Sequence, residues 1–142
     1  YVTDDYREYL EITSKENEEL YYTDGSILVS YNKIADGLLT WENFLKKYPN
    51  SDLAEKANEE CNTYRRIYIL GSYNSPTREG GWENSELFYI PENNLKEFNR
   101  FIKKYPNSPT TEIIKYYLEN YKNENINDML VDKNEEIYNR GE

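Results

Sequence analysis

One segment of the chain occurs twice. Residues 41–51, with the sequence WENFLKKYPNS, recur as FNRFIKKYPNS at residues 98–108, displaced by 57 positions without a gap. In both copies an aromatic stripe leads into two lysines, which suit the negative end of a helix dipole. Pro-Asn-Ser then provides a turn and a residue that can cap the next helix. Each copy is therefore predicted to be a helical hairpin, and two stacked hairpins can share a core.

Turn and capping residues divide the rest of the chain into segments in which apolar residues recur at helical spacing. We expect helices to begin at Thr3, Ser26, Asp52, Pro91, Ser108 and Asn127. We expect them to end at Asp24-Gly25, Pro49-Asn50, Gly71, Pro106-Asn107 and Gly141. Leu20 falls on the apolar face of the first of these helices, and Asp52 with Glu55 resembles a capping box.

The predicted fold is all-α and forms a single domain over residues 1–142. Two related helical hairpins, at about residues 26–70 and 91–122, combine with flanking helices in one compact bundle. Residues 71–90 are rich in turn formers and are expected to be an irregular loop insertion. Cys61 lies on the apolar stripe of its helix, so we expect a small buried side chain rather than a reactive thiol.

The segment Phe-Leu-Lys-Lys-Tyr-Pro-Asn-Ser at 44–51, followed by Leu-Ala-Glu-Lys-Ala at 53–57, resembles a known repeat. It is similar to the tetratricopeptide-type repeat of bacterial envelope proteins, such as outer-membrane assembly lipoproteins and periplasmic cell-division coordinators. The resemblance implies an exported or lipid-anchored bacterial protein. Tetratricopeptide units follow one another about every 34 residues, whereas these copies are displaced by 57 positions. The small Ala54 and Ala57 are also replaced by Thr111 and Ile114 in the second copy. We therefore expect a bundle of related hairpins rather than a regular superhelix.

Composition argues against several functions. The net charge of −10 disfavours nucleic acid and anionic membrane surfaces as partners, whereas it would attract a basic protein. The chain has no histidine and a single cysteine, so it lacks the usual proton shuttle and any plausible zinc cage. No phosphate-binding glycine loop or membrane-spanning apolar run occurs. We therefore expect no cofactor, no metal site and no transmembrane segment.

The irregular segment provides the main candidate binding site. It contains Tyr73, Asn74, Arg78, Trp82 and Tyr89, with Glu83 and Asn84 beside the tryptophan. Exposed rings next to amides and acids can stack on sugars or hold a peptide. The alternative is that Trp82, Phe88 and Tyr89 pack the loop onto the bundle.

Four lysines at repeat-equivalent positions form a second candidate. They are Lys46, Lys47, Lys103 and Lys104. These lysines could bind an acidic partner at two similar places. They could equally serve to complement the helix dipoles and keep the protein soluble.

Three functions follow from these features. The first is a non-enzymatic module that binds a protein or peptide partner, of which an acidic inhibitor of a basic toxin would be a variant. The second is a glycan or cell-wall binding domain that uses the Tyr/Trp loop. The third is a carboxylate-based hydrolase, although the acidic pairs Glu18-Glu19, Glu59-Glu60 and Glu135-Glu136 look like solvated helix faces.

The resemblance favours an extracytoplasmic location, and a cytoplasmic one stays open. Because the sequence begins at Tyr1 rather than Met, we expect any signal peptide to have been removed.

Overall fold

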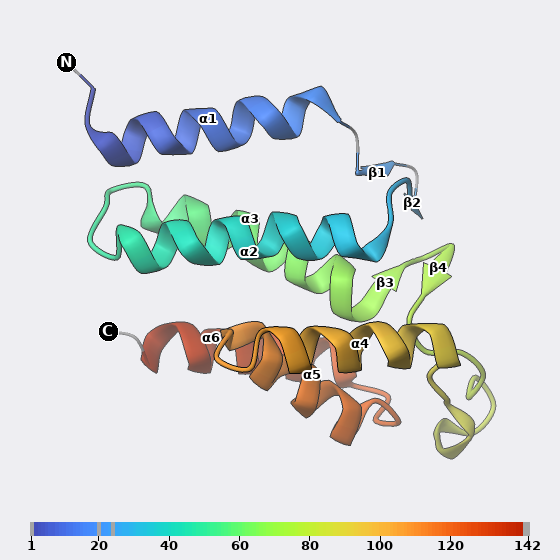
Figure 1. Cartoon of the computed structure of the whole chain (residues 1–142). Coiled ribbons are helices and arrows are strands. Elements are labelled where there is room, and N and C mark those ends of the chain that lie inside the picture. The colour runs from blue at the N-terminus through green and yellow to red at the C-terminus, as the bar shows by residue number, and fades with distance from the viewer. Residues whose placement is uncertain (1, 20, 24, 141–142) are drawn as a thin grey trace. The chain divides into compact units, whose positions relative to one another are not determined.

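The computed structural model describes residues 2–19, 21–23 and 25–140. Among these residues six α-helices account for most of the chain, which confirms the predicted all-α fold (Figure 1). They are α1 (Asp4–Glu18), α2 (Tyr31–Lys47), α3 (Ala54–Leu70), α4 (Glu92–Lys104), α5 (Pro109–Asn120) and α6 (Ile126–Arg140). The strands are short and form two-stranded ribbons: β1 (Tyr22–Thr23) with β2 (Ser26–Ile27), and β3 (Gly71–Ser72) with β4 (Ser75–Pro76).

The chain divides into two compact units, Tyr1–Ser75 and Pro76–Glu142. Unit 1 contains α1, α2 and α3, and unit 2 contains α4, α5 and α6. Each unit therefore holds one copy of the repeated hairpin, α2–α3 in the first and α4–α5 in the second. Within each unit consecutive helices run in opposite directions (Figure 1).

The end of the first hairpin helix has the same geometry in both copies. Tyr48 ends α2 with φ −128° and ψ 59°, and Tyr105 ends α4 with φ −127° and ψ 60°. The backbone N–H of each tyrosine donates to the carbonyl of the phenylalanine four residues earlier, Phe44 or Phe101, at 2.8 Å. The two rings of each pair also meet, with centroids 5.1 and 5.0 Å apart. The repeated sequence thus encodes one local structure twice.

The serine of the turn starts the second hairpin helix in both copies. The Ser108 hydroxyl accepts a hydrogen bond from the backbone N–H of Thr110 at 3.1 Å, as predicted for a cap. The Ser51 hydroxyl accepts from the N–H of Leu53 at the same distance. The expected cap at Asp52 is wrong, because Ser51 supplies the accepting oxygen and α3 begins only at Ala54.

Two other predicted helix starts are also wrong. Ser26 belongs to β2, which pairs with β1, and α2 begins later at Tyr31. Asn127 lies inside α6, which begins at Ile126. Thr3 does precede α1, but its side chain makes no capping hydrogen bond to the helix. Leu20, Asp24 and Gly141 themselves fall outside the described residues, but the predicted end of the first helix at Asp24-Gly25 is wrong, because α1 ends at Glu18 and Tyr22–Thr23 form β1. Gly71 does end α3, with φ +77°.

The chain has 16 tyrosines, and aromatic rings fill much of the core. In unit 1 one buried cluster consists of Trp41, Phe44, Ala57 and Cys61, with Tyr9, Ile12, Leu45, Tyr48, Leu53 and Tyr64 packed against it. In unit 2 the fully buried residues include Phe98, Phe101, Ile113, Ile114, Tyr117 and Ile126. The predicted burial of Cys61 is confirmed, and this burial raises the pKa of its thiol to about 11.

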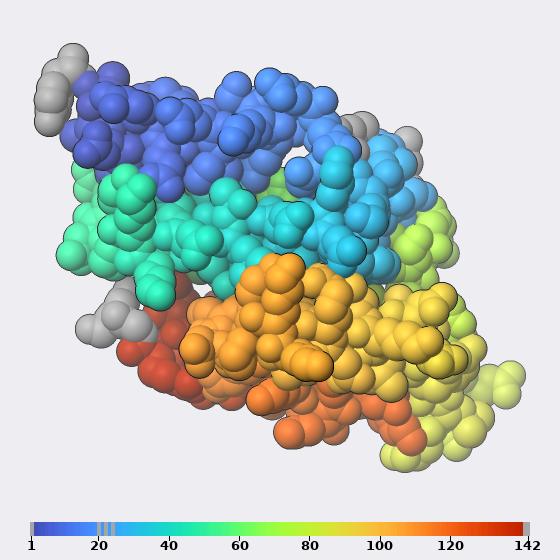
Figure 2. All heavy atoms as spheres, viewed as in Figure 1, coloured from blue at the N-terminus to red at the C-terminus, as the bar shows by residue number. Residues whose placement is uncertain are grey.

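Helix α1 lies along α2 as a separate layer (Figure 2), and none of its residues is fully buried. Carboxylates hold much of it in place. Four acids at or near one face bond to the rest of unit 1: Asp5 to Ser51, Glu8 to Lys47 and Tyr48, Glu16 to Trp41, and Glu19 to Lys33.

The indole N–H of Trp41 donates to Glu16 Oε1 at 2.6 Å. Burial raises the pKa of the Glu16 carboxyl above its ordinary value of 4.5, although hydrogen bonds from Trp41 and Tyr64 oppose the shift.

This shift predicts how the free energy of unfolding depends on pH. Because folded Glu16 holds its proton more tightly than unfolded Glu16, its contribution to stability is largest below pH 4.5. That contribution declines as the pH rises from there through the raised folded-state pKa. Glu16→Gln, which cannot ionise, should remove this decline. Urea unfolding of both proteins across this range measures the difference.

The control for this prediction is Glu11→Gln, on the exposed side of α1. It should leave the wild-type profile unchanged over the same pH range. Parallel pH profiles for wild type and Glu16→Gln would contradict the role assigned to Glu16.

Candidate functional site

The candidate site is the segment of residues 77–90, between β4 and α4 in unit 2, which we call the loop platform. Its first residue is fixed to two helices. The hydroxyl groups of Thr77 and Tyr117 are hydrogen-bonded at 3.0 Å, and the side-chain amide of Asn94 donates to the Thr77 carbonyl at 3.2 Å. Thr77 is only 1% exposed. The platform therefore starts from a fixed point on α4 and α5.

Arg78 anchors the platform to the end of α5. Its guanidinium donates to the carbonyl oxygens of Tyr121 and Asn123, the latter at 3.0 Å. These carbonyls follow the last turn of α5, where the helix dipole attracts a positive charge. The same guanidinium lies over the Phe88 ring, 3.8 Å from its centroid. Arg78 is thus directed inward, and burial lowers the pKa of its guanidinium.

The two ends of the platform pair with each other. Glu79 and Tyr89 form an antiparallel bridge with backbone N–H···O distances of 2.8 and 3.0 Å. The Tyr89 hydroxyl also donates to Glu79 Oε2 at 2.9 Å. Gly81 then turns with φ +74°, and a Cβ atom there would lie 2.3 Å from the Phe88 ring. The platform thus needs glycine at this position, because Phe88 packs directly on the backbone.

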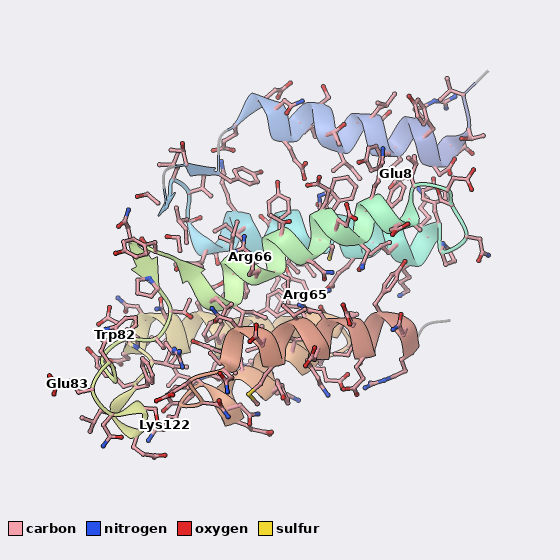
Figure 3. All side chains as sticks on the ribbon, turned by 180° about the vertical axis from the view of Figure 1, so that it is seen from behind. Glu8, Arg65, Arg66, Trp82, Glu83 and Lys122 are labelled. Carbon is pink, nitrogen blue, oxygen red and sulfur yellow. The ribbon has the colours of Figure 1, made fainter. Side chains whose placement is uncertain are left out.

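Three apolar side chains of the platform remain exposed. Trp82 is 86% exposed, Leu87 64% and Tyr89 52%, whereas Phe88 is 6% exposed. The rings of Trp82 and Phe88 meet edge to face, with centroids 5.9 Å apart. Figure 3 shows Trp82 and Glu83 at the outer edge of the loop. Of the three rings that could pack the loop onto the helices, Phe88 is the buried one and Trp82 faces solvent.

The outer part of the platform carries carboxylates. Glu79, Glu83 and Glu86 are all exposed. The ammonium group of Lys122 lies 3.9 Å from Glu86 Oε2, at the limit of an ion pair. Asn84 caps the short 3₁₀ turn Ser85–Leu87 by accepting from the backbone N–H of Glu86 at 3.0 Å.

The five candidate residues predicted from sequence belong to two units. Arg78, Trp82 and Tyr89 lie in the loop platform, whereas Tyr73 and Asn74 lie in unit 1, in the turn between β3 and β4. Asn74 is bonded to the β1–β2 ribbon: its N–H donates to the Gly25 carbonyl at 3.0 Å and its side-chain amide to the Ser26 hydroxyl at 3.1 Å. Tyr73 is 92% exposed.

The repeat-equivalent lysines make similar local contacts. Lys47 lies over the Tyr48 ring and Lys104 over the Tyr105 ring, with the ammonium groups 5.2 and 5.5 Å from the ring centroids. Lys47 also donates to Glu8 at 2.7 Å. Lys46 and Lys103 are exposed. The contacts of Lys47 and Lys104 are those expected of residues that support the helix end.

Sequence reasoning did not identify Thr77, and it named Phe88 only together with Trp82 and Tyr89 as a ring that could pack the loop onto the helices. Nothing in the local pattern marks Thr77, because its partner Tyr117 lies 40 positions away. The Gly80-Gly81 pair was the available signal for Phe88, since consecutive glycines allow a ring to approach the backbone closely.

Among the described residues, no group of three or more acidic or cysteine side chains is arranged to hold a metal ion. No helix in the described part of the chain has the length and apolar character needed to cross a membrane. Comparison with protein-family models, curated proteins and solved structures finds no match for this chain. The candidate site therefore has to be interpreted from its own geometry.

Proposed function

We propose that this protein is a non-enzymatic interaction module that binds a protein or peptide partner through the loop platform. The observation that carries the proposal is the position of Trp82, which is 86% exposed on a loop whose neighbouring residues are anchored. Burying an aromatic side chain removes about 150–250 Å² of largely apolar surface from water, which favours association. Tryptophan is for this reason enriched among the residues that dominate protein interfaces.

The anchoring of the platform supports this proposal. Thr77, Arg78 and Phe88 are each tied to the helices or to the platform backbone. A preorganised loop loses little conformational freedom when it binds, so more of the contact energy appears as affinity. The scaffold also suits the role, since helical-repeat proteins commonly present surfaces to peptides and proteins.

The test compares wild-type protein with Trp82→Ala as immobilised bait in extracts of the source organism. The wild type should retain a protein that Trp82→Ala retains about tenfold less well, a loss that corresponds to about 1.4 kcal/mol. The control is Val131→Ala, which shortens an exposed apolar residue of α6 in the same unit. It should bind like the wild type. Equal retention by all three proteins would overturn the proposal.

Glycan binding is a second candidate, because exposed Glu83 and Asn84 follow the exposed Trp82 ring in the chain. A ring that stacks on a sugar next to hydrogen-bonding side chains would suit a polysaccharide. Protease-treated cell-wall polysaccharide should then bind the wild type and not Trp82→Ala. The carboxylate-based hydrolase has less support. Burial raises the pKa of the Glu16 carboxyl, as a catalytic acid would need, but Glu16 accepts a hydrogen bond from Trp41 and helps to attach α1 to the rest of unit 1.

We place this module in an exported or lipid-anchored bacterial protein, because of the resemblance of residues 44–57 to envelope repeats. Protease treatment of intact cells, with membrane fractionation alongside, tests this location. Recovery of the full-length protein in the cytoplasmic fraction, protected from protease after the outer envelope has been opened, would overturn it.

A further inference from the structure

In the loop platform the positive charge of Arg78 points inward, whereas the carboxylates are exposed. Arg78 is directed inward, onto the carbonyl groups that follow α5 and onto the Phe88 ring. The exposed ionisable side chains of the platform include Glu79, Glu83 and Glu86, all carboxylates. An anionic outer surface thus borders the exposed rings, and Lys122 approaches it only at Glu86.

We infer that the loop platform binds a cationic segment of its partner, in which an arginine or lysine lies on the Trp82 ring and pairs with the neighbouring carboxylates. This inference rests on the proposed function and names the chemistry of its partner. Trp82 is the best side chain for a cation–π contact, and the planar guanidinium of arginine can stack on it while donating to a carboxylate. The exposed Leu87 and Tyr89 would contact apolar residues beside the cation.

The charge of the whole chain favours the same occupant. With a net charge of −10, the protein attracts basic segments and repels acidic or phosphorylated ones over several ångströms. Such attraction acts at any acidic surface, however. We therefore expect binding to depend on the Trp82 ring and on the platform carboxylates more than on other carboxylates of the chain.

The experiment measures fluorescence anisotropy of three labelled peptides with the full chain. The peptides repeat Arg-Leu-Gly, Gln-Leu-Gly or Glu-Leu-Gly, so that they differ only in one polar side chain of each repeat, which is cationic, neutral or anionic. The arginine peptide should bind about tenfold more tightly than the glutamine peptide, and the glutamate peptide should not bind measurably. Trp82→Ala should weaken the arginine peptide by about tenfold, whereas Trp82→Phe should retain most of the affinity.

Two further variants separate the platform from general electrostatics. Glu83→Gln should weaken binding of the arginine peptide, whereas Glu119→Gln, which removes the same charge from an exposed site on α5, should not. Gly81→Ala retains every other side chain of the platform but places a Cβ atom against Phe88, so it should also weaken binding. Equal effects of Glu83→Gln and Glu119→Gln, or binding that Trp82→Ala leaves unchanged, would overturn the inference.

The outcomes also distinguish this inference from the proposed function. If the arginine peptide has no advantage but retention of a protein still depends on Trp82, the cationic occupant is wrong and the interaction module stands. If protease-treated polysaccharide binds in a Trp82-dependent manner and no peptide does, the platform is a glycan site. Both the cationic occupant and the protein-binding function are then wrong.

Discussion

Replacing Trp41 by alanine should lower the free energy of unfolding by about 3–5 kcal/mol. Trp41 is fully buried in unit 1, where its ring meets Tyr9 at a centroid distance of 5.3 Å and Phe44 at 6.0 Å. Alanine would leave a cavity between α1 and the α2–α3 hairpin. It would also remove the indole N–H that donates to Glu16 at 2.6 Å, so a partly buried carboxyl would lose a partner.

The chain provides a matched control for this prediction in its other tryptophan. Trp82→Ala is the same chemical change at a side chain that is 86% exposed, so it should shift the free energy of unfolding by no more than about 0.5 kcal/mol. Urea unfolding followed by circular dichroism measures both variants, since the helices supply the signal. Similar losses for the two variants would contradict the burial assigned to Trp41 and the exposure assigned to Trp82.

The second large effect is expected at a buried ion pair. Arg65→Leu should destabilise the protein by about 3–5 kcal/mol, because it removes the cation that pairs with the buried carboxylate of Glu42. Arg65 Nη2 lies 3.0 Å from Glu42 Oε1, and the two side chains are 7% and 9% exposed. Arg65 also donates from Nη1 to the Asn62 side chain at 2.9 Å.

The double variant Arg65→Leu with Glu42→Leu tests the cause of this loss. Two apolar side chains remove both charges together, so the double variant should be more stable than Arg65→Leu alone. Lys96→Leu is the control, since its pair with Glu92 is exposed, at 70% and 81%, and should cost less than about 1 kcal/mol. Additive losses in the double variant would show that the pair is not coupled as described.

The two copies of the hairpin have diverged where the platform is attached. Gly37 in α2 allows the Tyr64 ring to pack closely, because a Cβ atom at Gly37 would lie 2.8 Å from that ring. The equivalent residue of α4, Asn94, instead donates to the Thr77 carbonyl. One copy thus uses this position for core packing, and the other uses it to hold the candidate binding loop.

Much of the local structure could be predicted from the sequence. The hairpin in each copy, the cap at Ser108 and the burial of Cys61 depend on interactions between residues that are near in the chain or on one helical stripe. Helical periodicity and capping chemistry act over a few residues, so a single sequence displays them directly. The repetition at a displacement of 57 positions added independent support, because the same local signals occur twice.

Tertiary structure decided which candidate residues are exposed and which hold the scaffold. Trp82 and Phe88 are both aromatic residues of one loop. Nothing in their spacing indicates that the Phe88 ring packs against Arg78 while Trp82 faces solvent. The attachment of α1 through Glu16 likewise depends on a partner from another helix. Burial is a property of the whole packed unit, since a side chain is removed from water only by residues that folding brings to it. The sequence by itself therefore determined the hairpins, and only the folded units determined which residues of the candidate site are exposed.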